Sequence, residues 1–73
     1  MIEKEHLVKL ANQRMPFGKY QGRTIIELPE PYLLWFAKKG FPDNELGFLL
    51  SLALEIKING QEGLIRPLKV SNS

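Results

Sequence analysis

The sequence has no cysteine, only one histidine and only one tryptophan among its 73 residues. Without cysteine the chain forms neither a disulfide nor a thiolate metal site, and a single histidine excludes a cluster of imidazole ligands. We therefore predict no metal and no cofactor. Small domains without such supports rely on dense packing or on self-association. Four phenylalanines and two tyrosines make dense aromatic packing the expected support.

A long hydrophobic run is also missing. The longest apolar stretch, residues 48–56, is interrupted by Ser51 and Glu55, whereas a membrane-spanning helix needs about 20 apolar residues. The N-terminal residues lack the apolar centre of a secretory signal. We expect no membrane contact and a cytoplasmic location. An apolar fraction of 44% and a charged fraction of 25% are typical of a globular protein, and the length suits a single domain, residues 1–73.

One segment has no acidic residue. The net charge is only +2, but residues 15–26 contain Lys19 and Arg23 without any aspartate or glutamate. A locally basic segment attracts anions such as phosphate groups. The charge pattern thus indicates an anion-facing surface in the glycine-containing part of the chain.

The first half of the sequence predicts a helix and a hairpin. Apolar residues at three- and four-residue spacing favour a helix over residues 2–13, within an N-terminal helical segment 1–13. Two short β-capable runs, 15–17 and 23–26, flank a loop at 18–22 that begins and ends with glycine. A two-stranded hairpin is marginal alone, so this one is expected to pack on helices.

The second half predicts two helices. Pro31 suits the first turn of a helix that runs to Lys39 and stops at Gly40. Its six successive apolar or aromatic residues, 32–37, predict a short helix buried over most of its circumference, at the centre of the core.

A longer helix over residues 44–59 follows, with an unusually wide apolar arc. A last turn at 64–68 is expected to fold back, and residues 69–73 to form a frayed tail. The predicted fold class is therefore α+β, with an N-terminal helix, a β-hairpin and two helices packed on it. The predicted core consists of Leu7, Leu10, Phe17, Ile25, Leu34, Trp35, Phe36, Leu46, Leu49, Leu50 and Ala53.

Catalytic candidates are few. Nucleophilic catalysis needs a nucleophile, a base and an orienting group, and His6 lies with the apolar stripe of its helix, which favours a packing role. Of the carboxylates Glu27, Glu30, Asp43 and Glu45, three lie at helix starts, where acids are favoured structurally. We predict that the protein is not an enzyme and has no catalytic residue.

The segment from Gly18 to Arg23 is the one constellation that suggests binding. Lys19 and Arg23 flank Tyr20 on a turn that Gly18 and Gly22 permit. Such cations contact phosphates, and a tyrosine can stack on an unpaired base. This predicts a nucleic-acid contact made by these five residues. The structural alternative is that the glycines serve turn geometry, Tyr20 belongs to the core and the cations are merely solvated.

A second hypothesis comes from the helix at 44–59. Its apolar arc is wide for so short a chain, and a large exposed apolar patch usually marks an interface. The alternative function is therefore a protein–protein adaptor or a homodimer that associates through this helix.

The sequence also resembles a small bacterial family labelled as a quorum-sensing-regulated virulence factor. The resemblance covers roughly residues 13–68 and rests on MPFGKYQG at 15–22, LPEPYLLWF at 28–36, KGFP at 39–42 and ELG at 45–47. The label records a regulation context and names no activity.

A similar hairpin followed by a Tyr-Leu-x-Trp helix is found as an appendage of some exonucleases that degrade nucleic acid from the 3′ end. This resemblance implies a helper role near nucleic acid, with a single-stranded nucleic acid or a nuclease-type protein as partner. The acidic metal ligands of those exonucleases have no counterpart here, so nothing catalytic is implied. The shared feature is the segment from Phe17 to Gly22.

Overall fold

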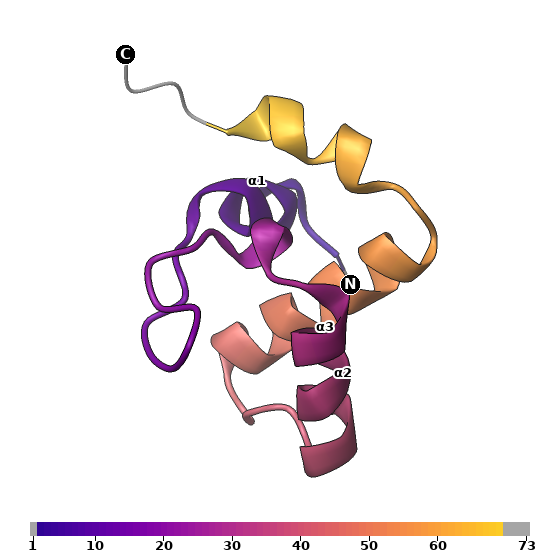
Figure 1. Cartoon of the computed structure of the whole chain (residues 1–73). Coiled ribbons are helices and arrows are strands. Elements are labelled where there is room, and N and C mark those ends of the chain that lie inside the picture. Colours follow the sequence, from indigo (N-terminus) through magenta and orange to yellow (C-terminus); the bar gives the residue numbers. More distant parts are fainter. Residues whose placement is uncertain (1, 70–73) are drawn as a thin grey trace.

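Helices dominate the computed structural model, which describes residues 2–69. This part of the chain contains three α-helices, α1 (Lys4–Asn12), α2 (Glu30–Lys39) and α3 (Glu45–Ile58) (Figure 1). Three short 3-10 helices complete it: η1 (Ile25–Glu27), η2 (Glu62–Leu64) and η3 (Arg66–Leu68).

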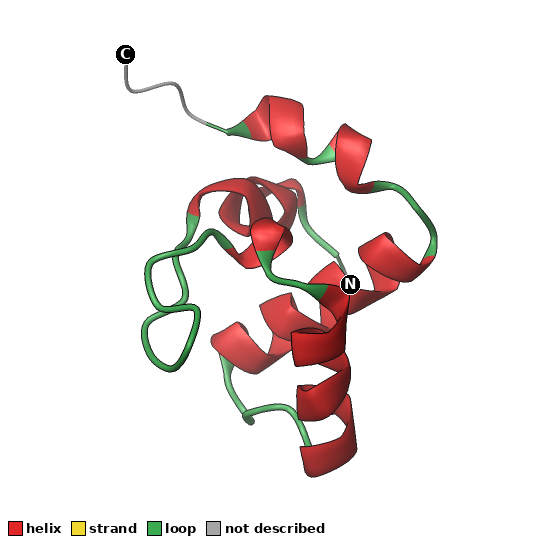
Figure 2. Ribbon diagram, viewed as in Figure 1, coloured by secondary structure: helices red, strands yellow, loops and turns green. Residues whose placement is uncertain are grey.

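The predicted α+β class is wrong, because no β-strand or hairpin occurs in the described part of the chain (Figure 2). The expected strands at 15–17 and 23–26 are replaced by a long loop and by η1. Strand-like pairing is limited to one isolated antiparallel bridge between Arg14 and Thr24. The protein is a helical domain with a loop where the hairpin was expected.

Packing explains why the second strand does not form. Ile25 and Ile26 are both buried, at 0% and 2% exposure. Successive residues of a strand point to opposite faces, so a short hairpin lying on helices would leave one of them outside. A turn of 3-10 helix instead brings both side chains and Leu28 into the core.

The centre of the core is α3, and not the helix that begins at Pro31. Seven of the fourteen residues of α3 are buried, and they lie on most sides of the helix. In α2, by contrast, only Leu33 and Phe36 are buried. The prediction that α2 is buried over most of its circumference is therefore wrong, since it packs on α3 along one side only.

The predicted core is confirmed in part. Leu10, Ile25, Phe36, Leu49, Leu50 and Ala53 are buried, and Leu7 and Leu46 pack partly buried against them. Phe17, Leu34 and Trp35 were wrongly assigned to the core, because they are 46%, 43% and 52% exposed. The core residues that the sequence did not identify are Ala11, Met15, Ile26, Leu28, Leu33, Leu52, Leu54, Ile56 and Ile65.

The segment 64–68 folds back as expected, and it packs on α1 through η3. The Asn12 side-chain amide donates a hydrogen bond to the carbonyl of Leu68 at 3.1 Å. Arg66 pairs with Glu27 at 3.3 Å. Of the predicted frayed tail, only Lys69 lies within the described residues. Within residues 2–69, no helix has the length and apolarity needed to cross a membrane.

The start of α3 requires a glycine. A Cβ atom at Gly47 would lie 1.7 Å from the carbonyl oxygen of Pro42 and 2.7 Å from its carbonyl carbon. Both are backbone atoms, so they cannot swing aside as a flexible side chain would. The side chain of Asn44 caps the same turn by accepting a hydrogen bond from the N–H of Gly47 at 3.0 Å. The segment before α3 is thus pressed against the helix at this one position.

Candidate functional site

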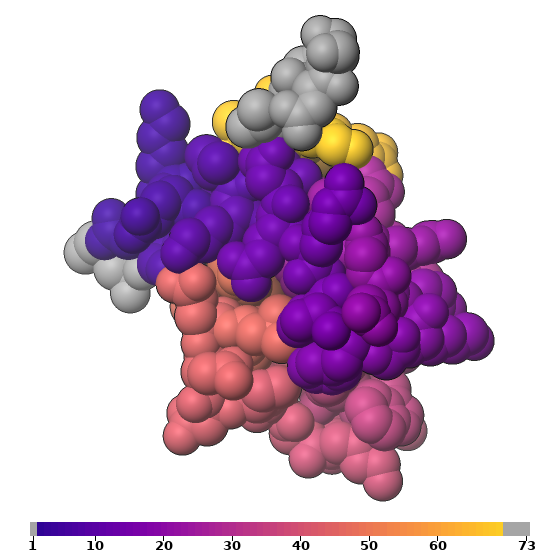
Figure 3. Space-filling view, turned by 90° about the vertical axis from the view of Figure 1, so that its left-hand side faces the viewer, coloured from indigo at the N-terminus to yellow at the C-terminus, as the bar shows by residue number. Residues whose placement is uncertain are grey.

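The predicted binding residues lie together on a projecting loop, residues 14–24, which we call the basic loop. Figure 1 shows it between α1 and η1, and in Figure 3 it stands out at one side of the molecule. The N–H of Met15 donates to the carbonyl of Arg23 at 2.7 Å, and the N–H of Gly22 donates to the carbonyl of Met15 at 2.9 Å. Arg14 adds a side-chain hydrogen bond to the Gly22 carbonyl. These bonds close the base of the loop.

Tyr20 anchors the tip of the basic loop to α2. Its ring packs edge-on against Tyr32, with centroids 4.7 Å apart, and Tyr32 continues to Phe36 at 5.2 Å. Tyr20 is half-buried, so it lies partly in the core and partly in solvent. Burial, and secondarily the nearby Tyr20, raise the pKa of Tyr32, so its hydroxyl is neutral at physiological pH. The aromatic contacts fix the loop in one place without adding charge.

Gly18 permits this contact. Its φ of +82° belongs to the left-handed region that favours glycine. A Cβ atom here would also lie 3.0 Å from the Tyr32 hydroxyl. The expectation that glycine serves turn geometry is confirmed here and at Gly22, whose φ is +92°. Gly18 additionally makes room for the α2 tyrosine.

Two cations lie against the ring of Tyr20. The ammonium of Lys19 is 5.5 Å from the ring centroid, and the guanidinium carbon of Arg23 is 5.4 Å from it. Both residues are exposed, and neither forms a salt bridge within residues 2–69. The structure thus brings Lys19, Tyr20 and Arg23 together around the turn that begins at Gly18 and ends at Gly22.

The arrangement is better suited to binding phosphates than to stacking bases. Cation–π contacts orient the two positive groups on one small surface, yet they leave the N–H donors pointing to solvent. The Tyr20 ring already contacts two cations and Tyr32, so a base could stack on it only by displacing one of them. The two cations at the tip can bind anionic groups. Arg23 can hold a phosphate by two parallel hydrogen bonds.

A second candidate surface was missed by sequence reasoning. Pro31, Leu34, Trp35 and Lys38 recur at three- and four-residue spacing and line a shallow groove on the side of α2 away from the core. We call these four residues the outer face of α2. Its apolar members were interpreted as core because six apolar residues follow one another. The regular spacing was the signal that one side of this helix is separate from the packed side.

The wide apolar arc at 44–59 is used inside the domain. Leu49, Leu50 and Ala53 are fully buried, and Leu52 and Ile56 are nearly so. Phe48 and Ile58 are the exposed large apolar residues of α3. Most of the apolar arc is therefore buried inside the domain, and self-association through residues 44–59 stays a prediction.

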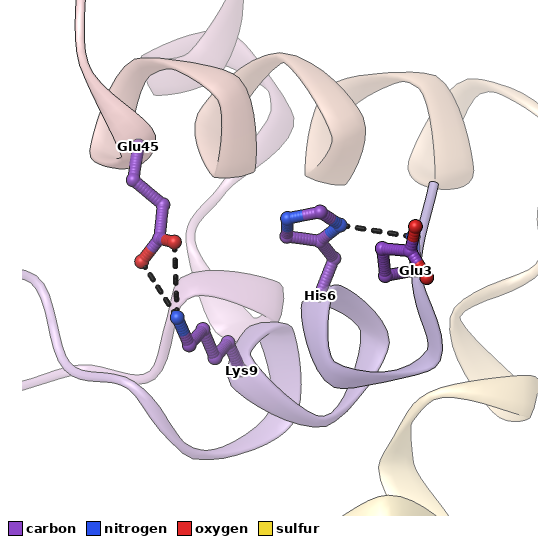
Figure 4. A network of polar contacts seen from close by, with 4 residues as sticks. All are labelled: Glu3, His6, Lys9 and Glu45. Carbon is purple, nitrogen blue, oxygen red and sulfur yellow. Dashed lines mark hydrogen bonds and ion pairs between the residues drawn. The ribbon is translucent and has the colours of Figure 1, made fainter. Parts of the chain in front are cut away.

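His6 has a structural role. Its Nδ1 accepts a hydrogen bond from the backbone N–H of Glu3 at 2.9 Å, which closes the start of α1 (Figure 4). The imidazole edge also contacts the ring of Phe48, with centroids 4.9 Å apart. Within residues 2–69 no group of three or more histidine, cysteine or acidic side chains is placed to hold a metal ion.

One ion pair ties α1 to α3. The ammonium of Lys9 contacts both carboxylate oxygens of Glu45, at 2.9 and 3.0 Å (Figure 4). The hydrogen bond to Lys9 lowers the pKa of Glu45, and the same bond raises the pKa of Lys9. Both groups lie at the surface, so the pair positions the start of α3 and forms no reactive centre.

Comparison with known proteins places this chain among bacterial relatives. Residues 3–68 match the family described as "Putative quorum-sensing-regulated virulence factor". Two curated relatives, from Escherichia coli strain K12 and from Escherichia coli O157:H7, both carry the name "Uncharacterized protein YpeB". Each is 55% identical to the chain over 69 residues, which is 93% of this chain and 96% of the relative. No solved structure shows significant similarity to the chain.

Proposed function

The chain belongs to the family described as "Putative quorum-sensing-regulated virulence factor", and we propose that it is a non-catalytic module that binds single-stranded nucleic acid through the basic loop. The observation that carries the proposal is the pair of exposed cations, Lys19 and Arg23, held on the ring of Tyr20 without a carboxylate partner in residues 2–69. Two cations beside one ring can contact two phosphates, or one phosphate from two sides.

The shape of the loop supports the same function. Its base is closed by backbone hydrogen bonds, and its tip is anchored by the Tyr20–Tyr32 contact. The backbone that carries the two cations is therefore positioned before a ligand arrives, so less conformational entropy is lost on binding. A projecting loop also reaches a flexible single strand without having to fit the grooves of a duplex.

The test is binding of a fluorescent single-stranded oligonucleotide, followed by anisotropy over a range of salt concentrations. Replacing Lys19 and Arg23 with alanine removes two phosphate contacts. The slope of log K against log salt should then fall by about 1.4, as each contact to a single strand contributes about 0.7. Affinity at low salt should fall at least about tenfold.

A charge-matched control separates the loop from general electrostatics. Lys4 and Lys69 are exposed and form no salt bridge in the described region, so Lys4→Ala with Lys69→Ala makes the same change in net charge elsewhere. This control should retain most of the affinity. Equal losses in the two double variants would reject the basic loop as the binding site.

A further inference from the structure

The outer face of α2 is an exposed apolar surface that carries Lys38 at one end. Glu30 lies just beyond its other end. Leu34 and Trp35 at its centre are 43% and 52% exposed. Glu30, Leu34 and Lys38 are spaced by four, so they form one row along the helix. We propose that this face pairs with the same face of a second copy of the chain, with the two α2 helices antiparallel about a two-fold axis near Leu34.

Charge complementarity points to a second copy as the occupant. In an antiparallel pair, Glu30 of one chain lies opposite Lys38 of the other, and the symmetry repeats this contact at the other end. Neither residue forms a salt bridge within residues 2–69. The helix dipoles also oppose one another in this arrangement, which is favourable. One surface that carries both charges and an apolar centre is self-complementary, as a two-fold interface requires.

The acidic end makes the same face a poor nucleic-acid surface. Trp35 beside Lys38 and Lys39 resembles a stacking site with basic neighbours, but the Glu30 carboxylate would repel a polyanion at the other end of the row. The face also differs from the basic loop in its position on α2, because Tyr32 and not Trp35 contacts Tyr20. The two proposals therefore stand or fall separately.

The expected dimer is weak. A face on a helix of ten residues buries less than the roughly 1,200 Å² of stable specific interfaces. Association should therefore depend on protein concentration and be seen in the micromolar to millimolar range. Most of the affinity should reside in Trp35, since tryptophan is among the residues that most often dominate interfaces.

Trp35 provides a direct probe, because it is the only tryptophan in the sequence. Sedimentation and tryptophan emission would be followed together as the full chain is concentrated. We expect a rise in mass toward the dimer and a blue shift of emission over the same range. Trp35→Ala should weaken association at least tenfold, whereas Ile58→Ala, which removes an apolar side chain that is 62% exposed on α3, should leave it unchanged.

A charge reversal tests the antiparallel arrangement. Glu30→Lys and Lys38→Glu should each weaken the dimer, and the double reversal should restore it, because the opposite charges then face one another again. If Glu30 only stabilised the start of the helix, the double reversal would not restore the dimer. Circular dichroism checks that each variant is folded. The proposal is overturned if the protein stays monomeric to millimolar concentration, if single reversals have no effect, or if Trp35 emission responds only to added oligonucleotide.

Discussion

Two helices of this protein each contain a long apolar run, and their environments are opposite, with α3 the more apolar of the two. α3 (Glu45–Ile58) is surrounded by α1, α2 and η1, and seven of its residues are buried. α2 (Glu30–Lys39) buries only two residues and exposes its tryptophan. The difference does not come from hydrophobicity alone, because residues 32–37 of α2 are also all apolar or aromatic. It comes from the number of elements that the rest of the chain supplies to cover each helix.

The uncovered side of α2 is where an interaction surface remains. A 73-residue chain cannot enclose two helices completely, since small domains bury a smaller share of their surface than large ones. α3 takes the central position and α2 is left with a packed side and a free side. The covered helix therefore contributes more of the core, and the half-covered helix keeps an exposed apolar side.

The largest effect should follow from crowding the start of α3. Gly47→Ala places a Cβ atom 1.7 Å from the backbone oxygen of Pro42, so the segment before α3 has to move away from the helix. We expect a loss of about 4 kcal/mol or more in the free energy of unfolding, measured by urea denaturation. Gly63→Ala is the control, since nothing lies within 4 Å of its added Cβ. A Gly47 variant of wild-type stability would contradict the close contact.

A matched pair of leucines compares the two helices directly. Leu50 in α3 is fully buried and Leu34 in α2 is 43% exposed. Leu50→Ala should cost about 3 kcal/mol through lost burial and the cavity left behind, whereas Leu34→Ala should cost less than about 1 kcal/mol. Both are measured in dilute protein, so that self-association does not contribute. Similar losses for the two variants would show that α2 is covered after all.

A smaller effect is expected where the basic loop meets α2. Gly18→Ala forces a β-carbon into a left-handed conformation and toward the Tyr32 hydroxyl, which should cost about 1 to 2 kcal/mol. Gly22→Ala introduces the same backbone strain, but no atom lies within 4 Å of its added Cβ. The difference in unfolding free energy between the two variants therefore measures the effect of the Tyr32 contact. Adding Tyr32→Phe to the Gly18 variant should recover part of the loss. If Tyr32→Phe restored none of the stability, Gly18 would lie farther from the Tyr32 hydroxyl than the close approach described above.

The smallest effect concerns the ion pair at the start of α3. The pKa of Glu45 is lowered from its ordinary value of 4.5 by the hydrogen bond from Lys9. The unfolded state therefore binds its proton more readily than the folded state, and the pair stabilises the fold above pH 4.5 but not once the pH falls through the lowered pKa. Lys9 has a raised pKa, so its contribution is complete below 10.5 and is lost as the pH rises through the raised value.

Glu45→Gln should consequently remove a small, acid-sensitive part of the stability. The measurement is the urea midpoint of the variant and the wild type from about pH 7 to about pH 3. The two curves should converge at the acidic end. A constant difference across the whole range would mean that the ion pair does not explain the effect of the substitution.

Local signals in the sequence predicted the helices well. α1, α2 and α3 lie within two residues of the expected bounds at every end, because prolines, glycines, a capping asparagine and apolar spacing all mark them. The same local signals did not reveal that the expected hairpin would be absent. Glycines at 18 and 22 do reverse the chain, as expected, but whether the returning segment becomes a strand depends on the burial of Ile25 and Ile26 together. That choice is made by tertiary packing.

The candidate binding residues could be selected from the sequence, whereas the exposed side of α2 could not. Lys19, Tyr20 and Arg23 are neighbours along the chain, so a loop of any geometry brings them near one another. Leu34 and Trp35 sit in a continuous apolar run whose exposed side depends on what covers the helix. Their spacing with Pro31 and Lys38 defines a face, but only the three-dimensional arrangement tells which face of α2 is packed.

The most direct test of the proposed function is a titration of isotope-labelled protein with a short single-stranded oligonucleotide, followed by amide chemical shifts at low and moderate salt. We predict shifts concentrated at residues 18–23 that shrink as salt increases, while the buried amides of α3 stay unchanged. Shifts that cluster elsewhere, or no shifts at low salt, would contradict the assignment of the basic loop as a nucleic-acid contact.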